Sequence, residues 1–204
     1  MEIKEGYYNF ESVTTKLAHD PASEKELFTL ALNELNKRFG VDLNGIEIGV
    51  LNGETSAHLL KIGNFIRLVG IDPIIPDSME SSLVGSEQII NQNTDFAEFR
   101  WGFIKDFSYN VSDMFENDSL HFIFIDGDHT YEAVKKDYEL YSHKVKKGGL
   151  IFFHDSRMNR GGANFHIGSS KFVDELILSE NEKQDGLRLI GEAFSLTCFF
   201  KQNS

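Results

Sequence analysis

Residues 122–131 read Phe-Ile-Phe-Ile-Asp-Gly-Asp-His-Thr-Tyr, and residues 148–155 read Gly-Gly-Leu-Ile-Phe-Phe-His-Asp. Each stretch is an apolar run that ends at an aspartate, Asp126 in the first and Asp155 in the second. A segment of helical length separates the two runs, so we predict a β-α-β unit. Its two parallel strands end at the same edge of a sheet, where open α/β folds bind ligands. The two carboxylates therefore predict a metal or acid–base site at that edge.

The rest of the chain alternates strand and helix patterns in the same way. We expect strands at 46–50, 67–71, 99–104, 120–125 and 150–153, and helices at 55–62, 87–91, 130–141 and 172–178. The apolar side chains of residues 194–200 alternate with others and predict a late antiparallel strand. We therefore predict a doubly wound, Rossmann-like α/β fold with helices on both faces. Its sheet is mostly parallel, with an antiparallel C-terminal strand.

A helical segment precedes this pattern. Ser23 and Glu26 have the spacing of a capping box, and Phe39-Gly40 ends the helix that follows. We expect residues 1–40 to form an N-terminal helical cap, either a lid or a packing element. Residues 41–204 would form the Rossmann-like core of a single domain.

The composition restricts the partners and the compartment. The chain has 32 acidic and 20 basic residues, a formal net charge of -12, which argues against a nucleic-acid partner. A single cysteine, Cys198, cannot form an intramolecular disulfide and indicates a reducing compartment. The first residues lack the pattern of a signal peptide, and no apolar segment approaches the roughly 20 residues that span a bilayer. We expect a soluble, cytoplasmic protein with no membrane partner, and the composition leaves a homo-oligomer open.

A glycine-containing turn follows the first expected strand of the core. Glu47, Gly49 and Gly53 have the spacing Glu-x-Gly-x-x-x-Gly, and Thr55 begins the next helix. Asp72 closes the second strand, where an acidic side chain accepts hydrogen bonds from ribose hydroxyls. Dinucleotide enzymes instead use Gly-x-Gly-x-x-Gly, a tight loop that binds pyrophosphate at a helix N-terminus. The looser spacing favours a cofactor without phosphates. The alternative is an ordinary β-α turn that needs glycines for its geometry.

These motifs together resemble a known family. The segments 47–53, 71–73, 125–131 and 148–155 occur in the order found in class I S-adenosylmethionine-dependent methyltransferases. More narrowly, the chain resembles small bacterial O-methyltransferases that act on sugars and antibiotics and are distantly similar to catechol-type enzymes. The most specific part is Asp-Gly-Asp-His-x-Tyr, at residues 126–131.

The resemblance implies a cofactor site for S-adenosylmethionine. Its methionine end, ribose and adenine would contact residues in the turns after the first three strands and at the start of the 126–131 motif. These residues are Glu47, Gly49, Gly53, Thr55, Asp72, Asp106, Ser108 and Asp126.

The resemblance also implies a metal and a base. In metal-dependent members, the residues matching Asp126 and Asp155 bind a divalent ion, and the residue matching Asp128 is the candidate general base. A hard cation such as Mg²⁺ orients an acceptor hydroxyl and stabilises its oxyanion, while a carboxylate or histidine removes the proton. We therefore predict Asp126, Asp155 and Ser156 as Mg²⁺ ligands, and Asp128 and His129 as catalytic residues. Ser156 departs from the pattern, because catechol-type enzymes have Asn there and some antibiotic enzymes a second Asp.

Several alternatives remain open at this level. His129 and His154 are each a base, a ligand or a hydrogen-bonding partner of the loop. An iron site of two histidines and Asp126 is conceivable, but it leaves the glycine motif unexplained. The glycine-rich segment 157–170 is either an acceptor-binding lid, with Arg157 or Arg160 meeting a polar substrate, or a solvated connection.

The predicted function is methyl transfer to a hydroxyl of a small molecule or sugar. The competing hypotheses are an NAD(P)-dependent oxidoreductase on a related sheet and a cofactor-binding module without turnover.

Overall fold

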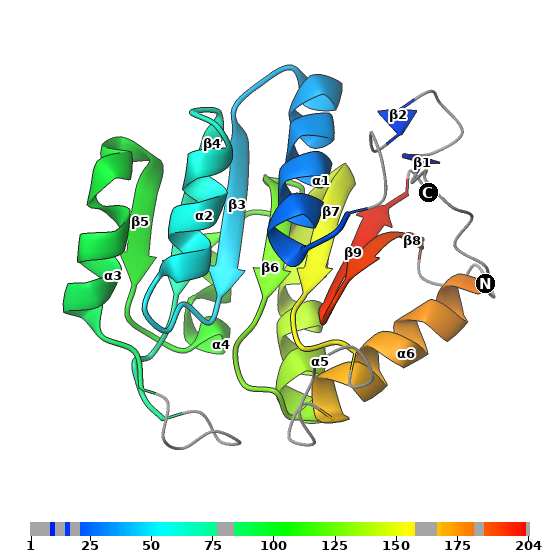
Figure 1. Ribbon diagram of the computed structural model, residues 1–204. Helices are drawn as coiled ribbons and strands as arrows, with labels where there is room; N and C mark the ends of the chain where they lie inside the picture. The colour runs from blue at the N-terminus through cyan, green and yellow to red at the C-terminus, as the bar shows by residue number, and fades with distance from the viewer. Residues whose placement is uncertain are drawn as a thin grey trace.

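The computed structural model describes residues 21–76, 84–157, 167–181 and 186–202, and the backbone of a small antiparallel pair, β1 (Asn9–Phe10) and β2 (Thr15–Lys16). The main sheet has seven strands in the order β5-β4-β3-β6-β7-β9-β8 (Figure 1). Their bounds are β3 (Leu43–Ile48), β4 (Ile66–Ile71), β5 (Trp101–Ile104), β6 (Leu120–Ile125), β7 (Val145–Phe153), β8 (Leu187–Ala193) and β9 (Leu196–Lys201). Strands β3 to β7 are parallel, and β9 runs antiparallel to both β7 and β8. The predicted fold class is confirmed, although β8 was not predicted.

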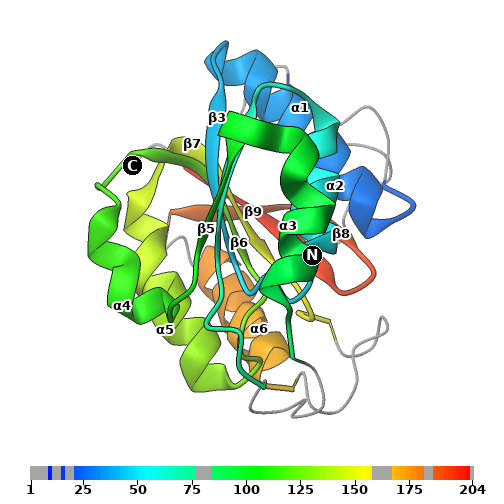
Figure 2. The same ribbon diagram turned by 90° about the vertical axis from the view of Figure 1, so that its left-hand side faces the viewer.

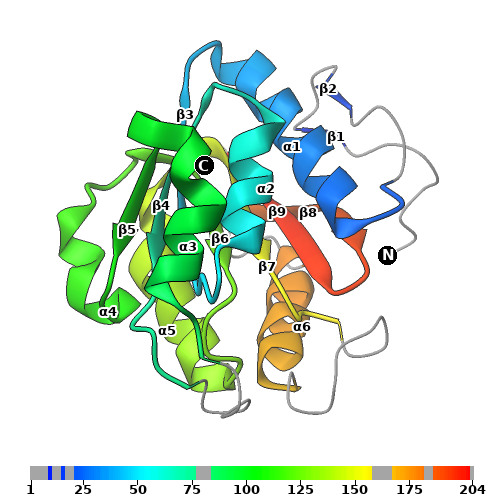
Figure 3. The same ribbon diagram turned by 60° about the vertical axis from the view of Figure 1, so that its left-hand side comes forward.

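Helices cover both faces of the sheet (Figures 2 and 3). One face carries α1 (Glu24–Phe39), α2 (Glu54–Ile62) and α3 (Glu87–Thr94); the other carries α4 (Ser108–Val111), α5 (Tyr131–Tyr141) and α6 (Ile167–Asn181). Short 3₁₀ segments are η1 (Asp95–Arg100), η2 (Ser112–Met114) and η3 (Ser142–Lys144). In β6, Phe122 and Phe124 belong to the core under α1, and Ile123 and Ile125 to the core under α5. A continuous apolar strand therefore fills two cores, as expected for a doubly covered parallel strand.

Helix α1 is part of this core. Its N-cap Ser23 accepts a hydrogen bond from the Glu26 amide at 3.2 Å, and its C-cap Gly40 has φ 67°. Leu27, Leu32 and the other apolar residues of its inner face are fully buried against the sheet. The segment before the sheet was predicted to be either a lid or a packing element. Helix α1 packs on the core.

The strand ends are aligned at one edge of the sheet. The hydrogen-bond ladder continues one residue past four strands, because the amides of Gly49, Asp72, Asp126 and His154 each donate to a carbonyl of the neighbouring strand, at 2.8 to 3.1 Å. These four residues therefore lie side by side, directly above β3, β4, β6 and β7.

One sequence-based boundary is corrected. The segment 157–170 is not all loop, because α6 begins at Ile167 and the Ser169 amide bonds to the His129 carbonyl at 3.1 Å. Arg160 lies outside the described residues.

Among the residues that the structure describes, no helix combines the length and the apolar character needed to cross a bilayer.

Replacing two left-handed glycines tests the alignment of β3 with β6. A Cβ on Gly49 (φ 86°) would lie 2.1 Å from the Asp126 carbonyl oxygen, whereas one on Gly40 (φ 67°) would meet nothing within 4 Å. We expect Gly40→Ala to lower the free energy of unfolding by about 1 to 2 kcal/mol from backbone strain alone. Gly49→Ala adds the clash and should lower it by about 3 to 5 kcal/mol. Urea denaturation measures both, and equal losses would contradict the close packing at Gly49.

Candidate functional site

A cavity of about 760 Å³ opens at the aligned strand ends. Its volume is typical of a small-molecule site. The predicted site residues that line it are Glu47, Gly49, Thr55, Asp72, Ser108, Asp126, Asp128, His129 and Asp155. Gly53, Asp106 and Ser156 were also predicted but are not among its lining residues.

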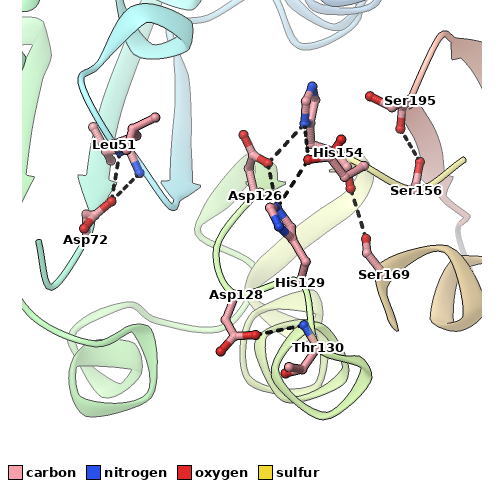
Figure 4. Close-up of polar contacts among 12 residues, drawn as sticks. Leu51, Asp72, Asp126, Asp128, His129, Thr130, His154, Ser156, Ser169 and Ser195 are labelled. Carbon is pink, nitrogen blue, oxygen red and sulfur yellow. Dashed lines mark hydrogen bonds and ion pairs between the residues drawn. The ribbon is translucent and has the colours of Figure 1, made fainter. Parts of the chain in front are cut away.

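Asp72 organises the turn after β3. One carboxylate oxygen, Oδ2, accepts hydrogen bonds from the amides of Val50 (2.8 Å) and Leu51 (2.9 Å), as Figure 4 shows for Leu51. The other, Oδ1, accepts one from the Ile74 amide at 2.6 Å. Oδ1 keeps a second lone pair, so a ribose contact stays a prediction.

The two glycines of the motif serve different purposes. Gly49 lines the cavity and is wedged against the Asp126 carbonyl. Gly53 is the N-cap of α2 with φ 76°, a conformation that L-residues rarely adopt. The structure therefore supports the alternative in which Gly53 is present because the β-α turn needs its left-handed backbone conformation.

Glu47 is a buried acid at the floor of the cavity. Its side chain is 1% exposed and its Oε2 accepts a hydrogen bond from the Ser56 hydroxyl at 2.5 Å. Burial raises the pKa of Glu47 from 4.5 to about 8; the Ser56 hydrogen bond opposes this shift, and the nearby charges of Asp126 and Asp72 add to it. At pH 7 the carboxyl group is therefore mostly neutral until a cation approaches it.

On the α4 and α5 side, the cavity wall differs from the prediction. Ser108 lines the cavity and donates its hydroxyl hydrogen bond to Asp137. Burial raises the pKa of Asp137 to about 6, against the effect of Ser108. Asp106 instead accepts hydrogen bonds from the Phe107 amide and the Asn110 side chain, both at 2.7 Å, and so orders the start of α4. Sequence reasoning missed Asp137, because an acid inside a helix gives no sign of its burial.

Four side chains converge at the ends of β6 and β7 (Figure 4). His154 Nδ1 lies 3.2 Å from Asp126 Oδ1 and 3.2 Å from Asp155 Oδ2. His129 Nε2 lies 3.6 Å and 3.3 Å from the same two oxygens. The predicted pair of strand-end aspartates is therefore brought together, with a histidine on either side.

The charges in this cluster depend on one another. Burial alone would raise the pKa of Asp126, but His154 and His129 lower it to about 2. Burial alone would lower the pKa of His154, but Asp126, Asp155 and Glu24 raise it well above its ordinary value. Asp126 is therefore kept ionised by the two imidazoles beside it.

The backbone fixes how two of the acids point. Asp155 has φ 47°, in the left-handed region that Asp and Asn tolerate better than most residues. Asp128 accepts a hydrogen bond from the Thr130 amide at 2.8 Å, at the start of α5. Figure 4 shows its carboxylate directed away from Asp126 and His154. Asp128 therefore lines the cavity at a distance from the cluster.

Two residues that had predicted roles make structural contacts. The Ser156 hydroxyl, expected as a metal ligand, donates to the Ser195 carbonyl at 2.6 Å (Figure 4). It also contacts Thr197 Oγ1 at 2.7 Å. Arg157, one of the two arginines offered as a substrate contact if the segment is a lid, is buried and paired with Glu192 and with Asp174. Both side chains are used to fasten the segment after β7 to β8, β9 and α6.

The cluster fits a divalent cation through a different third ligand. Asp126, His154 and Asp155 each offer one atom within 4.8 Å of the others. His154 Nδ1 is buried and lies 3.2 Å from one oxygen of each aspartate. Two carboxylate oxygens and one imidazole nitrogen that converge in this way can hold a divalent ion, so His154 takes the place expected for Ser156.

Glu24, the first residue of α1, reaches this site from the far end of the chain. Its carboxylate lies 3.3 Å from His154 Nε2. Burial raises the pKa of Glu24, but contacts with His154 and Ser195 outweigh it and leave the pKa below 4.5. The sequence offers no signal for this contact, because an acid in the first turn of a helix is already explained by the helix dipole.

A comparison of the sequence with models of known families gives a match to a methyltransferase domain over residues 46–156. The chain belongs to this methyltransferase family. The matched segment contains the strand ends and turns that line the cavity, from Glu47 to Asp155.

Known methyltransferase structures share the fold. The O-methyltransferase NovP has a TM-score of 0.63 and 17% identity, covering 88% of this chain and 79% of NovP. The O-methyltransferase TomG from Streptomyces achromogenes has a TM-score of 0.57 and 12% identity, covering 88% and 80%. An uncharacterized protein of Acanthamoeba polyphaga mimivirus is 32% identical over 143 residues, 66% of this chain. The match spans 61% of the length of that relative.

The pH dependence of stability tests the burial of Glu47. Its pKa is higher in the fold than in the unfolded chain, so its contribution is complete below about pH 4.5 and is lost as the pH rises through 8. The difference between the two pKa values corresponds to at most about 5 kcal/mol. We expect Glu47→Gln to remove most of this loss, so that the variant gains stability over the unsubstituted protein between pH 5 and 9. Urea unfolding across this range measures it, with the exposed Glu54→Gln as control; parallel curves for all three proteins would contradict the assignment.

Proposed function

We propose that this protein is an S-adenosylmethionine-dependent methyltransferase that methylates a hydroxyl of a small molecule or sugar, assisted by a divalent cation. The observation that carries the proposal is one cavity with two chemically different halves. Glu47 and Asp72 lie at the ends of β3 and β4, and the Asp126–His154–Asp155 cluster lies at the ends of β6 and β7. Membership of the methyltransferase family supports the cofactor half, and TomG is described in complex with S-adenosylmethionine.

The cofactor half, around Glu47 and Asp72, suits a positively charged cofactor that carries no phosphate groups. S-adenosylmethionine supplies an electrophilic methyl group on a sulfonium, beside an ammonium and a carboxylate. We infer that Glu47 faces the positively charged end, where it gains the partner that ionises it. The free lone pair on Asp72 Oδ1 accepts from a ribose hydroxyl. Ser108 borders the adenine.

The acceptor half suits a hydroxyl that must lose a proton. A divalent cation held by Asp126, His154 and Asp155 would stabilise the negative charge that develops on the acceptor oxygen. The acceptor oxygen forms the new O–C bond as the C–S bond breaks and its electron pair stays on sulfur. The hydroxyl proton passes to His129, whose Nε2 faces the same two carboxylates. Asp128, also predicted as the base, is the less suitable proton acceptor, because one of its carboxylate oxygens already accepts the Thr130 amide at the start of α5.

The acceptor is neutral or cationic in this proposal. After β6, on the acceptor side, the described lining carries Asp128 and Glu132 besides the cluster, and Glu54 follows β3 on the cofactor side. Lys136 is the one lysine among the described lining residues. Like charges in a cavity disfavour binding of an anion.

Cofactor titration separates this proposal from an NAD(P)-dependent oxidoreductase. We expect calorimetry to show binding of S-adenosylhomocysteine and no comparable binding of NADH or NADPH. Asp72→Ala should weaken S-adenosylhomocysteine by about 10- to 100-fold, because it removes a charged hydrogen-bond acceptor. Asp42→Ala removes an exposed acid that pairs with Arg67 at the opposite end of β3 and should leave the affinity unchanged. Tighter binding of a nicotinamide cofactor would reject the proposal.

Methyl-transfer assays test the base and distinguish an active enzyme from a binding module. With a panel of phenols, catechols and sugars, we expect His129→Gln to lower kcat by about 100-fold or more, the usual contribution of a general base. Asp128→Asn should change kcat much less. Asp155→Asn keeps a residue that tolerates the left-handed backbone, so a loss of activity there reports on the carboxylate. Large loss in Asp128→Asn with an active His129→Gln would return the base role to Asp128.

A further inference from the structure

The carboxylate of Glu24 is held between two distant parts of the chain. Its Oε1 accepts hydrogen bonds from the Ser195 amide (3.0 Å) and the Ser195 hydroxyl (2.7 Å), in the turn between β8 and β9. Its Oε2 lies 3.3 Å from His154 Nε2. The N-cap function of α1 is already supplied by Ser23, which accepts from the Glu26 amide. Glu24 is therefore not needed to cap its own helix.

This contact sets the direction of the His154 ring. The two ring nitrogens face opposite carboxylates, Nε2 towards Glu24 and Nδ1 towards Asp126 and Asp155. The ring edge also packs against Phe124, with centroids 6.0 Å apart and planes at 88°. When a cation displaces the Nδ1 proton, Nε2 keeps the hydrogen that binds Glu24, and the lone pair of Nδ1 points into the space between the two aspartates. A histidine held in this way by an outer carboxylate is the usual arrangement of a metal-binding imidazole.

We propose that Glu24 is a positioning residue that makes His154 a nitrogen ligand, so that the site selects a transition-metal ion such as Co²⁺ or Zn²⁺ over Mg²⁺. The inference rests on the divalent cation of the proposed function and adds its chemical class. Mg²⁺ prefers oxygen ligands in near-ideal octahedral geometry, whereas imidazole suits later first-row ions. Two carboxylates and one imidazole form a mixed set that matches the second group.

Co²⁺ binding tests the proposal independently of turnover. In the unsubstituted protein we expect Co²⁺ to bind, with visible absorption bands that a large excess of Mg²⁺ does not remove. Glu24→Ala should weaken Co²⁺ by about 10- to 100-fold, the usual effect of losing an outer partner of a metal-binding histidine. Glu24→Gln keeps a hydrogen-bond acceptor without the charge, so its affinity for Co²⁺ should lie between those of the unsubstituted protein and Glu24→Ala. Glu34→Gln removes the same charge from the same helix and should change nothing.

Proton NMR of the Co²⁺-loaded protein gives a signature that loss of packing alone would not produce. An imidazole bound through Nδ1 shows a strongly shifted, solvent-exchangeable Nε2–H resonance. We expect this resonance in the unsubstituted protein and in His129→Gln, its absence in His154→Gln, and faster exchange in Glu24→Ala. Thermal unfolding of each variant confirms that it is folded.

Two outcomes would overturn the proposal while the proposed function stands. One is Co²⁺ affinity and spectrum unchanged in Glu24→Ala. The other is loss of the shifted resonance in His129→Gln instead of His154→Gln. A protein that binds S-adenosylhomocysteine but neither Co²⁺ nor Mg²⁺ would instead reject the cation of the proposed function, and this inference with it.

Discussion

The site depends on the shared register of four parallel strands. The backbone ladder extends one residue past β3, β4, β6 and β7, so Gly49, Asp72, Asp126 and His154 emerge at one level of the sheet. A change of register by one residue would turn the side chains of Asp72, Asp126 and His154 to the opposite face. The buried side chains of β6 and β7 oppose such a shift, because alternate residues pack closely into two different cores. Packing far from the cavity therefore holds its chemistry in place.

The two halves of the cavity treat their acids differently. Glu47 is buried beside a single hydroxyl and stays neutral until a cation approaches, whereas Asp126 is ionised by the imidazoles around it. Asp72 is stabilised by three backbone amides. In the proposed function, Glu47 would suit a sulfonium cofactor and Asp126 a divalent cation. The ends of β3 and β6, which are neighbours in the sheet, keep the two halves of the cavity adjacent.

The sequence predicted what depends on local pattern. The apolar runs of β6 and β7, their terminal aspartates and the alternation of β9 were sufficient for the fold class and for one edge of the site. It did not predict what depends on tertiary contacts. Ser156 and Arg157 follow Asp155 in the sequence, yet both turn towards the β8–β9 hairpin, which had not been predicted. Glu24 reaches His154 across 130 positions of the chain. The burial that raises the pKa of Asp137 is likewise set by the fold and has no local signature.

The central claim is that a cofactor and a cation share this one edge. A crystal grown with S-adenosylhomocysteine and Co²⁺, measured at the cobalt absorption edge, tests it directly. The account predicts an anomalous peak bounded by Asp126, Asp155 and Nδ1 of His154, with the adenosyl group along the turn that Asp72 holds. S-adenosylhomocysteine bound in the cavity without a peak at these three residues would contradict the cation site. A cavity that does not take up S-adenosylhomocysteine would contradict the account as a whole.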